Sequence, residues 1–377
     1  MKRVLFIENR PDYGLGGIEN YNQKLIKILK QNFPNVIIDK CNLLNTFDKN
    51  DDDLENTNKF KSTKHTKWIS NIKNQFIFNC LIGFHLISFR KLVYRLVEQN
   101  HYDLIIDSTI TFFKKLKDNS NYYWVQHVTP EYYDFSCMKN KFARSITFLA
   151  SRLFGMRNPI KQNHNIIVYD KKNLEVAKSL NPTINATDIN LSYKVPNLVI
   201  TKDDIKDRKG IIYLGRINQE QKNISFLSKL NNQLQIIDFY GAGDSKYTNK
   251  LGNFYKGSVE NSHVGAIISK YKYCILLSNY EGFSFSLVEA LSYGVPIIVL
   301  DTFCSASYLV DNDSNGLLIN RNESLSVIEQ KIIDLLNISE DKYFALCKNA
   351  YNFAKQNLTD ETFDKKWLVI FNKYLKE

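Results

Sequence analysis

The sequence of 377 residues contains only six cysteines, and none of them forms a Cys-x-x-Cys pair or has a metal-binding spacing. They are scattered over both halves of the chain, at positions 41, 80, 137, 274, 304 and 347. Small secreted domains instead place their cysteines in dense disulfide frameworks. The absence of such a framework excludes this class and indicates a reduced, cytoplasmic protein.

Long hydrophobic runs are also missing. A membrane-spanning helix needs about 20 predominantly apolar residues, whereas the longest apolar stretch, 76–89, is interrupted by Asn79 and His85 and ends at Arg90. The N-terminus has two charges and then only four apolar residues before Glu8, which is too short for a signal peptide. We therefore expect a buried or interfacial helix near 76–89 and a first strand at the N-terminus.

Acidic residues are too few to balance the basic ones, and the formal net charge is +11. Residues 1–196 contain 29 Lys and Arg against 18 Asp and Glu, while residues 197–377 contain 21 of each kind. The whole positive excess therefore lies in the first half, which predicts an anionic partner for that half.

The length of the chain is sufficient for two domains. Its first half alternates short apolar strands with helices, which favours a parallel α/β sheet, and the predicted strands are 4–7, 35–42, 102–108, 122–128 and 165–169. Residues 46–67 are polar and charged, so we expect a mobile loop. Asp51–Asp53 lies within this segment and mimics an Asp-x-Asp metal motif, but it does not end a buried strand, and we expect no metal site.

The second half predicts a second set of the same kind, with strands at 210–217, 234–243 and 253–259. Its most informative stretch is 273–301, which predicts a strand, a loop, a helix from about Ser284 and another strand. Ligands bind open α/β sheets at the carboxyl ends of parallel strands. The amides around Gly282–Ser286, at the start of the predicted helix, would suit a phosphate.

Two carboxylates accompany this stretch, Glu281 in the loop and Glu289 on the helix. At about 100° per residue, Glu289 lies on the same side as Phe285 and Tyr293 and away from the apolar stripe. An outer face would not carry two aromatics, so we expect this second face to be covered as well. The alternative is a surface glutamate that happens to flank a buried helix.

Glu281, Gly282, Phe283 and Ser284, followed by Glu289 and by Gly294-Val295-Pro296, resemble the sequence motif of retaining glycosyltransferases of the GT-B fold, family 4. The resemblance implies that Glu281 and the amides after it hold the donor sugar, and that Glu289 binds the ribose hydroxyls of the nucleotide. It further implies substrate binding by Gly282, Phe283 and Ser284.

Other segments fit the same family. Gly215-Arg216 with Lys222 resembles its Gly-Arg loop and following lysine, which neutralise the donor diphosphate; two surface cations are the alternative. The remaining positions implied to bind substrate are Gly16, Gly17, Gly257 and Val259. A tight turn between a strand and a helix would require the same two glycines, Gly16 and Gly17. A dinucleotide-binding motif would need a third glycine at the position of Glu19.

His127 follows a predicted buried strand. The resemblance implies a histidine there that contacts the donor sugar or the acceptor, and we count it with Glu281, Arg216 and Lys222 as a catalytic candidate. A satisfied structural histidine is the alternative.

The resemblance implies an α/β protein of the GT-B fold, with two Rossmann-like, doubly wound parallel-sheet domains facing a cleft. We expect an acceptor-binding domain at 1–196, a donor-binding domain at 197–356 and a C-terminal helix, 357–377, that crosses back to the first domain. Val195-Pro196-Asn197 resembles the family's hinge.

The expected function is retaining transfer of a sugar from a nucleotide-diphosphate sugar, with UDP favoured, to a glycan or lipid-linked glycan in cell-surface polysaccharide biosynthesis. We expect no cofactor, no metal and no nucleic-acid partner. The alternatives are a non-catalytic nucleotide-sugar or glycan-binding partner of another transferase, a hydrolysing epimerase of similar fold, and a protein O-glycosyltransferase.

Residues 138–157 have the pattern of an amphipathic helix with basic residues around an apolar stripe, as in helices that lie in an anionic interface. The stripe could instead pack on the domain core. The first interpretation predicts a cytoplasmic enzyme held peripherally at the inner face of the cell membrane.

Overall fold

The computed structural model describes residues 1–8, 17–42, 57–61, 75–109, 116, 119–127, 160, 165–219, 221–311 and 314–376. Of residues 17–19, 57–61 and 75–86 it describes the backbone alone. Asp51–Asp53, Gly16 and the predicted helix 138–157 lie outside these residues.

The chain divides into two compact units. Unit 1 comprises Met1–Tyr169, Asn173–Ile189 and Asp364–Glu377, and unit 2 comprises Asp170–Lys172 and Asn190–Phe363. Apart from residues 170–172, the chain passes from unit 1 to unit 2 at 189/190 and returns to unit 1 at 363/364. The domain boundaries predicted from the sequence are 196/197 and 356/357.

Unit 1 contains a seven-stranded sheet of order β3-β2-β1-β4-β5-β6-β7. All neighbouring strands are parallel, and their bounds are β1 Arg3–Glu8, β2 Ile37–Asn42, β3 Thr57–Lys61, β4 Leu104–Asp107, β5 Tyr122–Val125, β6 Asn165–Val168 and β7 Asn185–Asp188. Every residue of β4, β5 and β6 is buried. Continuous burial is what a parallel sheet covered on both faces requires.

Two strands of this sheet depart from the sequence prediction. Thr57–Lys61 pairs with β2 along its whole length, so the predicted loop 46–67 is wrong for these five residues. Asn185–Asp188 adds a strand beside β6. Both are edge strands of mostly polar residues. Their sequences therefore lack the apolar pattern by which buried strands are recognised.

The helices assigned to unit 1 are α1 Gly17–Asn32, α3 Gln75–Gln99 and most of α5 Lys171–Leu180. The C-terminal helix α14, Asp360–Leu375, belongs to unit 1 from residue 364 onward. There Trp367 is fully buried and its Nε1 donates to the Tyr21 hydroxyl at 3.1 Å. The predicted return of the C-terminal helix to the first domain is therefore confirmed.

Unit 2 contains a parallel six-stranded sheet of order β10-β9-β8-β11-β12-β13. Its strands are β8 Ile211–Leu214, β9 Ile237–Tyr240, β10 Tyr255–Gly257, β11 Tyr273–Leu276, β12 Ile297–Asp301 and β13 Gly316–Asn320. The order reverses between β8 and β11, which places a topological switch point there. The prediction of two doubly wound parallel sheets is confirmed.

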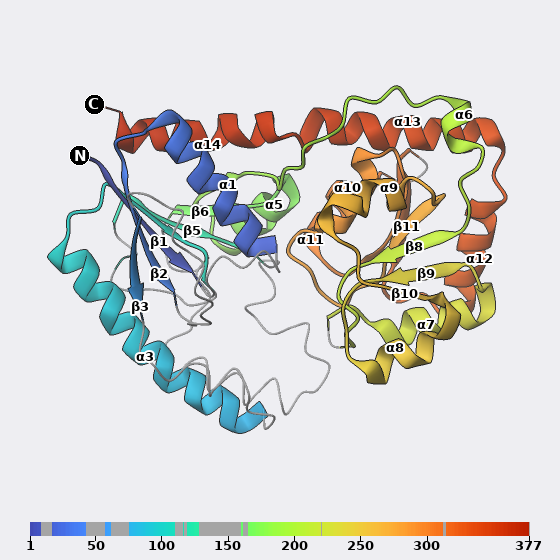
Figure 1. Ribbon diagram of the computed structural model, residues 1–377, viewed down its shortest axis with the longest axis horizontal. Coiled ribbons are helices and arrows are strands. Elements are labelled where there is room, and N and C mark those ends of the chain that lie inside the picture. The colour runs from blue at the N-terminus through green and yellow to red at the C-terminus, as the bar shows by residue number, and fades with distance from the viewer. Residues whose placement is uncertain are drawn as a thin grey trace. The chain divides into compact units, whose positions relative to one another are not determined.

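Helices cover both faces of this second sheet (Figure 1). The longer connections and the C-terminal region supply α6 Lys202–Ile205, α7 Ile224–Leu234, α8 Ser245–Leu251, α9 Val264–Ile268, α10 Phe285–Ser292, α11 Cys304–Leu309, α12 Leu325–Leu336 and α13 Glu340–Asn357. Helix α10 contacts α9 and α13, and α7 contacts α8 and α12. The helix that carries Glu289 is thus enclosed by neighbours, as expected for a helix with two covered faces.

The loops after β8 and β9 run side by side. Ile217 and Gly243 form a parallel bridge beyond the named strands. Gly241 has a φ of +142°, and a Cβ there would lie 1.9 Å from the Gly215 carbonyl oxygen. Only glycine allows this approach, so Gly241 fixes the position of the loop that carries Arg216.

In the part of the chain that the structure describes, no helix combines the length and the apolar character needed to cross a bilayer.

Candidate active site in the second unit

The loop after β8 is held in shape by its own amide side chains. Asn218 Oδ1 accepts the backbone N–H groups of Gln221 at 3.3 Å and Lys222 at 3.0 Å. Gln219 Oε1 accepts the N–H of Ser225 at 2.7 Å, in the first turn of α7. The Asn218 side chain therefore replaces backbone partners and fixes the path of residues 218–222, whereas the Gln219 side chain satisfies an amide of α7.

Lys222 meets Glu281 in a buried ion pair. The Lys222 Nζ lies 2.5 Å from Glu281 Oε1, and only 10% and 6% of the two side chains are exposed. Lys222 follows β8 and Glu281 follows β11, and these strands are neighbours in the sheet. Their carboxyl ends therefore bring together two residues that are 59 positions apart in the sequence.

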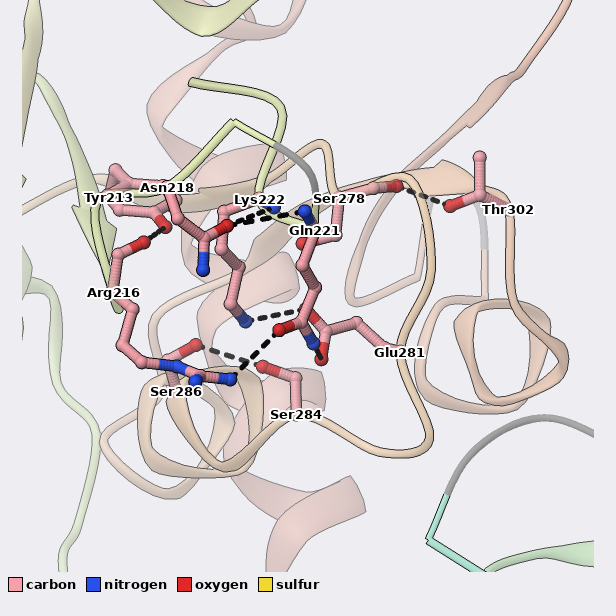
Figure 2. A network of polar contacts seen from close by, with 10 residues as sticks. All are labelled: Tyr213, Arg216, Asn218, Gln221, Lys222, Ser278, Glu281, Ser284, Ser286 and Thr302. Atoms are coloured by element: carbon pink, nitrogen blue, oxygen red, sulfur yellow. Dashed lines mark hydrogen bonds and ion pairs between the residues drawn. The ribbon is translucent and has the colours of Figure 1, made fainter. Parts of the chain in front are cut away.

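Gln221 connects the same carboxylate to Arg216. Gln221 Nε2 donates to Glu281 Oε2 at 3.0 Å, and Arg216 Nη2 donates to Gln221 Oε1 at 2.9 Å. Figure 2 shows the resulting chain of polar contacts from Arg216 through Gln221 and Glu281 to Lys222. Two cations and one carboxylate form one network at the switch point of the sheet.

Tyr213 contacts this network through the backbone of Arg216. Its hydroxyl donates to the Arg216 carbonyl at 2.7 Å. Burial, and next the charge of Glu281, raise the pKa of Tyr213 well above its usual value. The hydroxyl therefore stays protonated and acts as a donor at all working pH values.

The loop between β11 and α10 is fixed by hydroxyl groups. Ser305 Oγ donates to the Gly282 carbonyl at 2.8 Å, and Thr302 Oγ1 donates to the Ser278 carbonyl at 2.6 Å. Phe283 is buried, with its ring centre 6.4 Å from that of Tyr308. The backbone on both sides of Glu281 is thereby anchored.

Ser284 is the N-cap residue of α10, but its side chain makes no capping hydrogen bond. Its hydroxyl lies 2.9 Å from that of Ser286 instead. The first-turn amides of α10 are therefore not satisfied by this side chain, and together with the positive end of the helix dipole they can receive an anion.

The other end of α10 is held by a buried arginine. Arg208 precedes β8, and its guanidinium donates to the carbonyls of Gly294 at 2.6 Å and Tyr293 at 3.0 Å. A positive charge at a helix C-terminus satisfies the last carbonyls and the helix dipole. Arg208 therefore sets the position of the helix that carries Glu289.

Glu289 is half-buried and does not belong to the fully buried apolar face of α10. Burial raises the pKa of Glu289 from 4.5 to about 7. The pKa values of Tyr193 and Cys274 are raised as well. Burial is the larger cause for both, and the charge of Glu289 is the second. A largely buried carboxyl group whose pKa is shifted to near 7 is a frequent feature of binding sites.

Gly257 and Val259 lie at and after the end of β10. Gly257 has a φ of +83°, and no atom of the described residues outside its two chain neighbours lies within 4 Å of the position that a Cβ would take. Its backbone therefore borders open space beside β9, as expected for a surface that a flat ligand approaches.

His127 belongs to unit 1, where it follows β5. Its Nδ1 pairs with the Tyr169 hydroxyl, and its ring lies edge-on to that of Tyr21 at 5.5 Å. The buried Nε2 has no hydrogen-bond partner among the described residues. Burial lowers the pKa of His127 to about 3, so the ring is neutral at pH 7. Its role remains a prediction.

Of the predicted residues, the structure joins Lys222 and Glu281 directly and links Arg216 to them through Gln221. Gly282, Phe283 and Ser284 lie in the same loop, Gly17 begins α1, and Gly16 is outside the described residues. Sequence reasoning missed Gln221, Asn218 and Arg208. The amide-rich run between Arg216 and α7 was the available signal for the first two.

Among the described residues, no three His, Cys, Asp or Glu side chains gather as metal ligands would. Arg216 and Lys222 carry positive charge at the site.

Comparison with known proteins agrees with this geometry. Two Rossmann-like parallel sheets, with an Arg, Lys and Glu network at the switch point of the second, are the arrangement expected for the GT-B fold. Residues 200–355 match the family model "Glycosyl transferases group 1". The predicted resemblance is therefore confirmed at the level of group 1, over a segment that lies within unit 2.

Two curated relatives match part of the chain. One is the GtfA subunit of a UDP-N-acetylglucosamine–peptide N-acetylglucosaminyltransferase from Streptococcus agalactiae, 26% identical over 157 residues, which are 37% of this chain and 30% of the relative. The other is a poly(ribitol-phosphate) alpha-N-acetylglucosaminyltransferase from Staphylococcus aureus, 27% identical over 109 residues, 28% of this chain and 21% of the relative. The chain thus matches less than a third of either relative's length.

The structural similarity covers nearly the whole length of the chain. The structure of sucrose-phosphate synthase from Thermosynechococcus elongatus is similar with a TM-score of 0.75 at 14% identity, covering 99% of both chains. This similarity confirms the predicted GT-B fold.

Proposed function

We propose that this protein is a retaining glycosyltransferase of the family 4 type that moves a sugar from a UDP-sugar to a glycan acceptor. The observation that carries the proposal is the network of Arg216, Lys222 and Glu281 beside the N-terminus of α10. It provides two cations and free amides for a diphosphate, next to a carboxylate for the sugar.

In the proposed reaction, an acceptor hydroxyl forms a bond to the anomeric carbon while the bond from that carbon to the diphosphate oxygen breaks. The departing diphosphate takes the hydroxyl proton. Arg216, Lys222 and the α10 amides stabilise the charge that develops on the leaving group. Glu281 orients the sugar, and Glu289 binds the ribose hydroxyls. His127 contributes to sugar or acceptor binding.

The choice of donor is supported by the relative whose name contains UDP-N-acetylglucosamine. We propose UDP-N-acetylglucosamine and UDP-glucose as the first donors to test. UDP-sugars of this kind carry an α linkage, so an α-linked product would establish retention. We also propose that transfer needs no metal, because the protein supplies the cationic charge itself.

For the acceptor we propose an anionic surface glycan or a lipid-linked glycan, reached by a cytoplasmic enzyme at the inner face of the membrane. The positive excess in residues 1–196 supports this, as does similarity to a transferase named for poly(ribitol phosphate). A protein acceptor is the second candidate, favoured by similarity to a transferase named for peptides.

The test is UDP release by the purified protein with a panel of UDP-sugars, first without acceptor and then with poly(ribitol phosphate), neutral glycans and unfolded peptides. NMR of the anomeric proton then gives the product's configuration. Turnover with one donor and an α product is expected. Donor binding without hydrolysis or transfer would favour a non-catalytic partner instead.

A further inference from the structure

Gln221 makes contacts that neither the family motif nor the proposed chemistry assigns to it. We propose that Gln221 is a positioning residue for sugar transfer, whose amide holds Arg216 and Glu281 in one fixed arrangement. This inference rests on the proposed function, because it concerns the orientation of the groups that bind the donor.

The amide has only one orientation that satisfies both neighbours. Its Oε1 accepts from the Arg216 guanidinium at 2.9 Å, and its Nε2 donates to Glu281 Oε2 at 3.0 Å. A flipped amide would set N–H against a group that only donates and oxygen against a group that only accepts. The charges on either side therefore determine which end of the amide faces which neighbour.

The contact also completes the coordination of the carboxylate. Lys222 Nζ binds Glu281 Oε1 and Gln221 binds Oε2. With both oxygens held by different donors, the plane of the carboxylate is fixed. Lys222 alone, as a single point charge on a flexible stem, would leave the carboxylate free to rotate.

The backbone of Gln221 joins the same two loops. Its N–H donates to Asn218 Oδ1 at 3.3 Å, and its carbonyl accepts the N–H of Asn279 at 2.8 Å. Asn279 lies two residues before Glu281 and Asn218 two residues after Arg216. Gln221 therefore links the β8 and β11 loops through both its backbone and its side chain.

The neutrality of the amide matters for the charge of the network. Arg216, Lys222 and Glu281 together carry a formal charge of +1, which suits a diphosphate. A glutamate at position 221 would cancel it. Glutamine thus provides polarity for orientation without reducing the attraction for the donor.

The first test compares Gln221→Met with Gln219→Met, using the donor for which the wild type is active. Both variants lose a glutamine amide from the same loop, but among the described residues the Gln219 side chain binds only the backbone N–H of Ser225. We expect kcat of Gln221→Met to fall about tenfold to a hundredfold, the loss typical of one or two hydrogen bonds to charged groups. Gln219→Met should keep the wild-type kcat and lose only thermal stability.

The second test uses the pH profile of Gln221→Glu, which a merely structural role would not change. When protonated, the new carboxyl group donates to Glu281 and accepts from Arg216, as the amide does. When ionised, it stands beside Glu281 as a like charge, and this repulsion raises the pKa of the pair. The charged and titratable side chains that face this position among the described residues are Arg216, Lys222, Glu281 and Tyr213.

We expect the ratio of Gln221→Glu to wild-type kcat/KM to rise at least tenfold as the pH is lowered from 8.5 to 5.5. A ratio that does not change with pH, or wild-type kcat in Gln221→Met, would overturn the proposed role. An equal loss in Gln219→Met would do the same. If the wild type itself transfers no sugar from any UDP-sugar, the proposed function fails and this inference with it.

Discussion

Lys222 and Glu281 form an ion pair of 2.5 Å in which both side chains are almost completely buried. Each charge is costly to bury alone, and each is stabilised mainly by the other. The pair therefore couples the stability of unit 2 to the groups that bind the donor in the proposed reaction.

We expect Lys222→Met to destabilise unit 2 by about 3 kcal/mol, because it leaves the Glu281 charge buried without a cation at Oε1. The double variant Lys222→Met/Glu281→Gln should recover most of that stability, since no uncompensated charge remains. Both should lose transfer activity roughly a hundredfold. Urea unfolding and UDP release measure the two effects. A double variant as unstable as the single one would contradict the paired arrangement.

Glu289 provides a pH dependence. Its pKa is raised to about 7 by burial. In the proposed function the ribose hydroxyls donate to its ionised form, so donor affinity should increase as the pH rises from 6 to 8. We expect a change of about tenfold in the Kd of UDP-N-acetylglucosamine, whose diphosphate does not titrate in this range. Glu289→Gln should bind more weakly and without this dependence. Equal pH profiles in the two proteins would exclude Glu289 from the donor site.

The raised pKa of Glu289 has the opposite effect on stability, which should decrease as the pH rises. The folded state holds a proton on Glu289 that the unfolded state releases near pH 4.5, so stability falls as the pH rises between these two pKa values. Glu289→Gln should therefore be more stable than the wild type at pH 8, by at most about 3 kcal/mol. The two should be alike near pH 4.5. Thermal unfolding at both pH values checks this.

Arg208 should contribute strongly to the stability of unit 2 without entering the site. Its guanidinium binds two carbonyls at the end of α10, so we expect Arg208→Met to cost about 3 kcal/mol. Arg208→Lys should recover only part of this, because one ammonium does not reproduce the planar fork. Arg216→Met, at an exposed position, is the matched control and should leave the melting temperature unchanged. Equal melting temperatures for both methionine variants would contradict the capping role.

The sequence predicted the two doubly wound sheets because their central strands are continuous apolar runs. It located Arg216, Lys222 and Glu281 through a motif, and the parallel order of β8 and β11 explains why these distant residues meet. Edge strands such as β3 and β7 were missed because their polar residues carry no periodic pattern.

Gln221 could not be assigned from the sequence for a different reason. Its importance lies in the direction of one amide between two charges, which depends on three side chains meeting in space. Arg208 was missed similarly, since its partners are backbone carbonyls 85 and 86 positions away. Contacts of this kind leave no spacing rule in the sequence.

We expect transfer to proceed at its full rate in excess EDTA, because Arg216 and Lys222 carry the charge that a divalent ion would otherwise supply. The assay is UDP release before and after chelation, followed by addition of Mn²⁺ or Mg²⁺. Activity that is lost with EDTA and restored by either ion would show that a metal takes part.

The last prediction concerns the membrane and follows from the distribution of charge. The excess of basic residues is confined to 1–196, and the sequence of residues 138–157 has the pattern of an amphipathic helix with basic residues. Each basic residue near an acidic leaflet contributes about 1 kcal/mol, so four together can hold a protein there reversibly. We expect flotation with acidic but not neutral liposomes, lost at high salt and on changing four residues to Gln, namely Lys139, Lys141, Arg144 and Arg152. The matched control removes the same charge from exposed positions of unit 2, with Gln at Lys246, Lys250, Lys342 and Lys348, and should still float. Binding that ignores lipid charge, or an equal loss in the control, would reject docking by this segment and favour an acceptor that is not bound to the membrane.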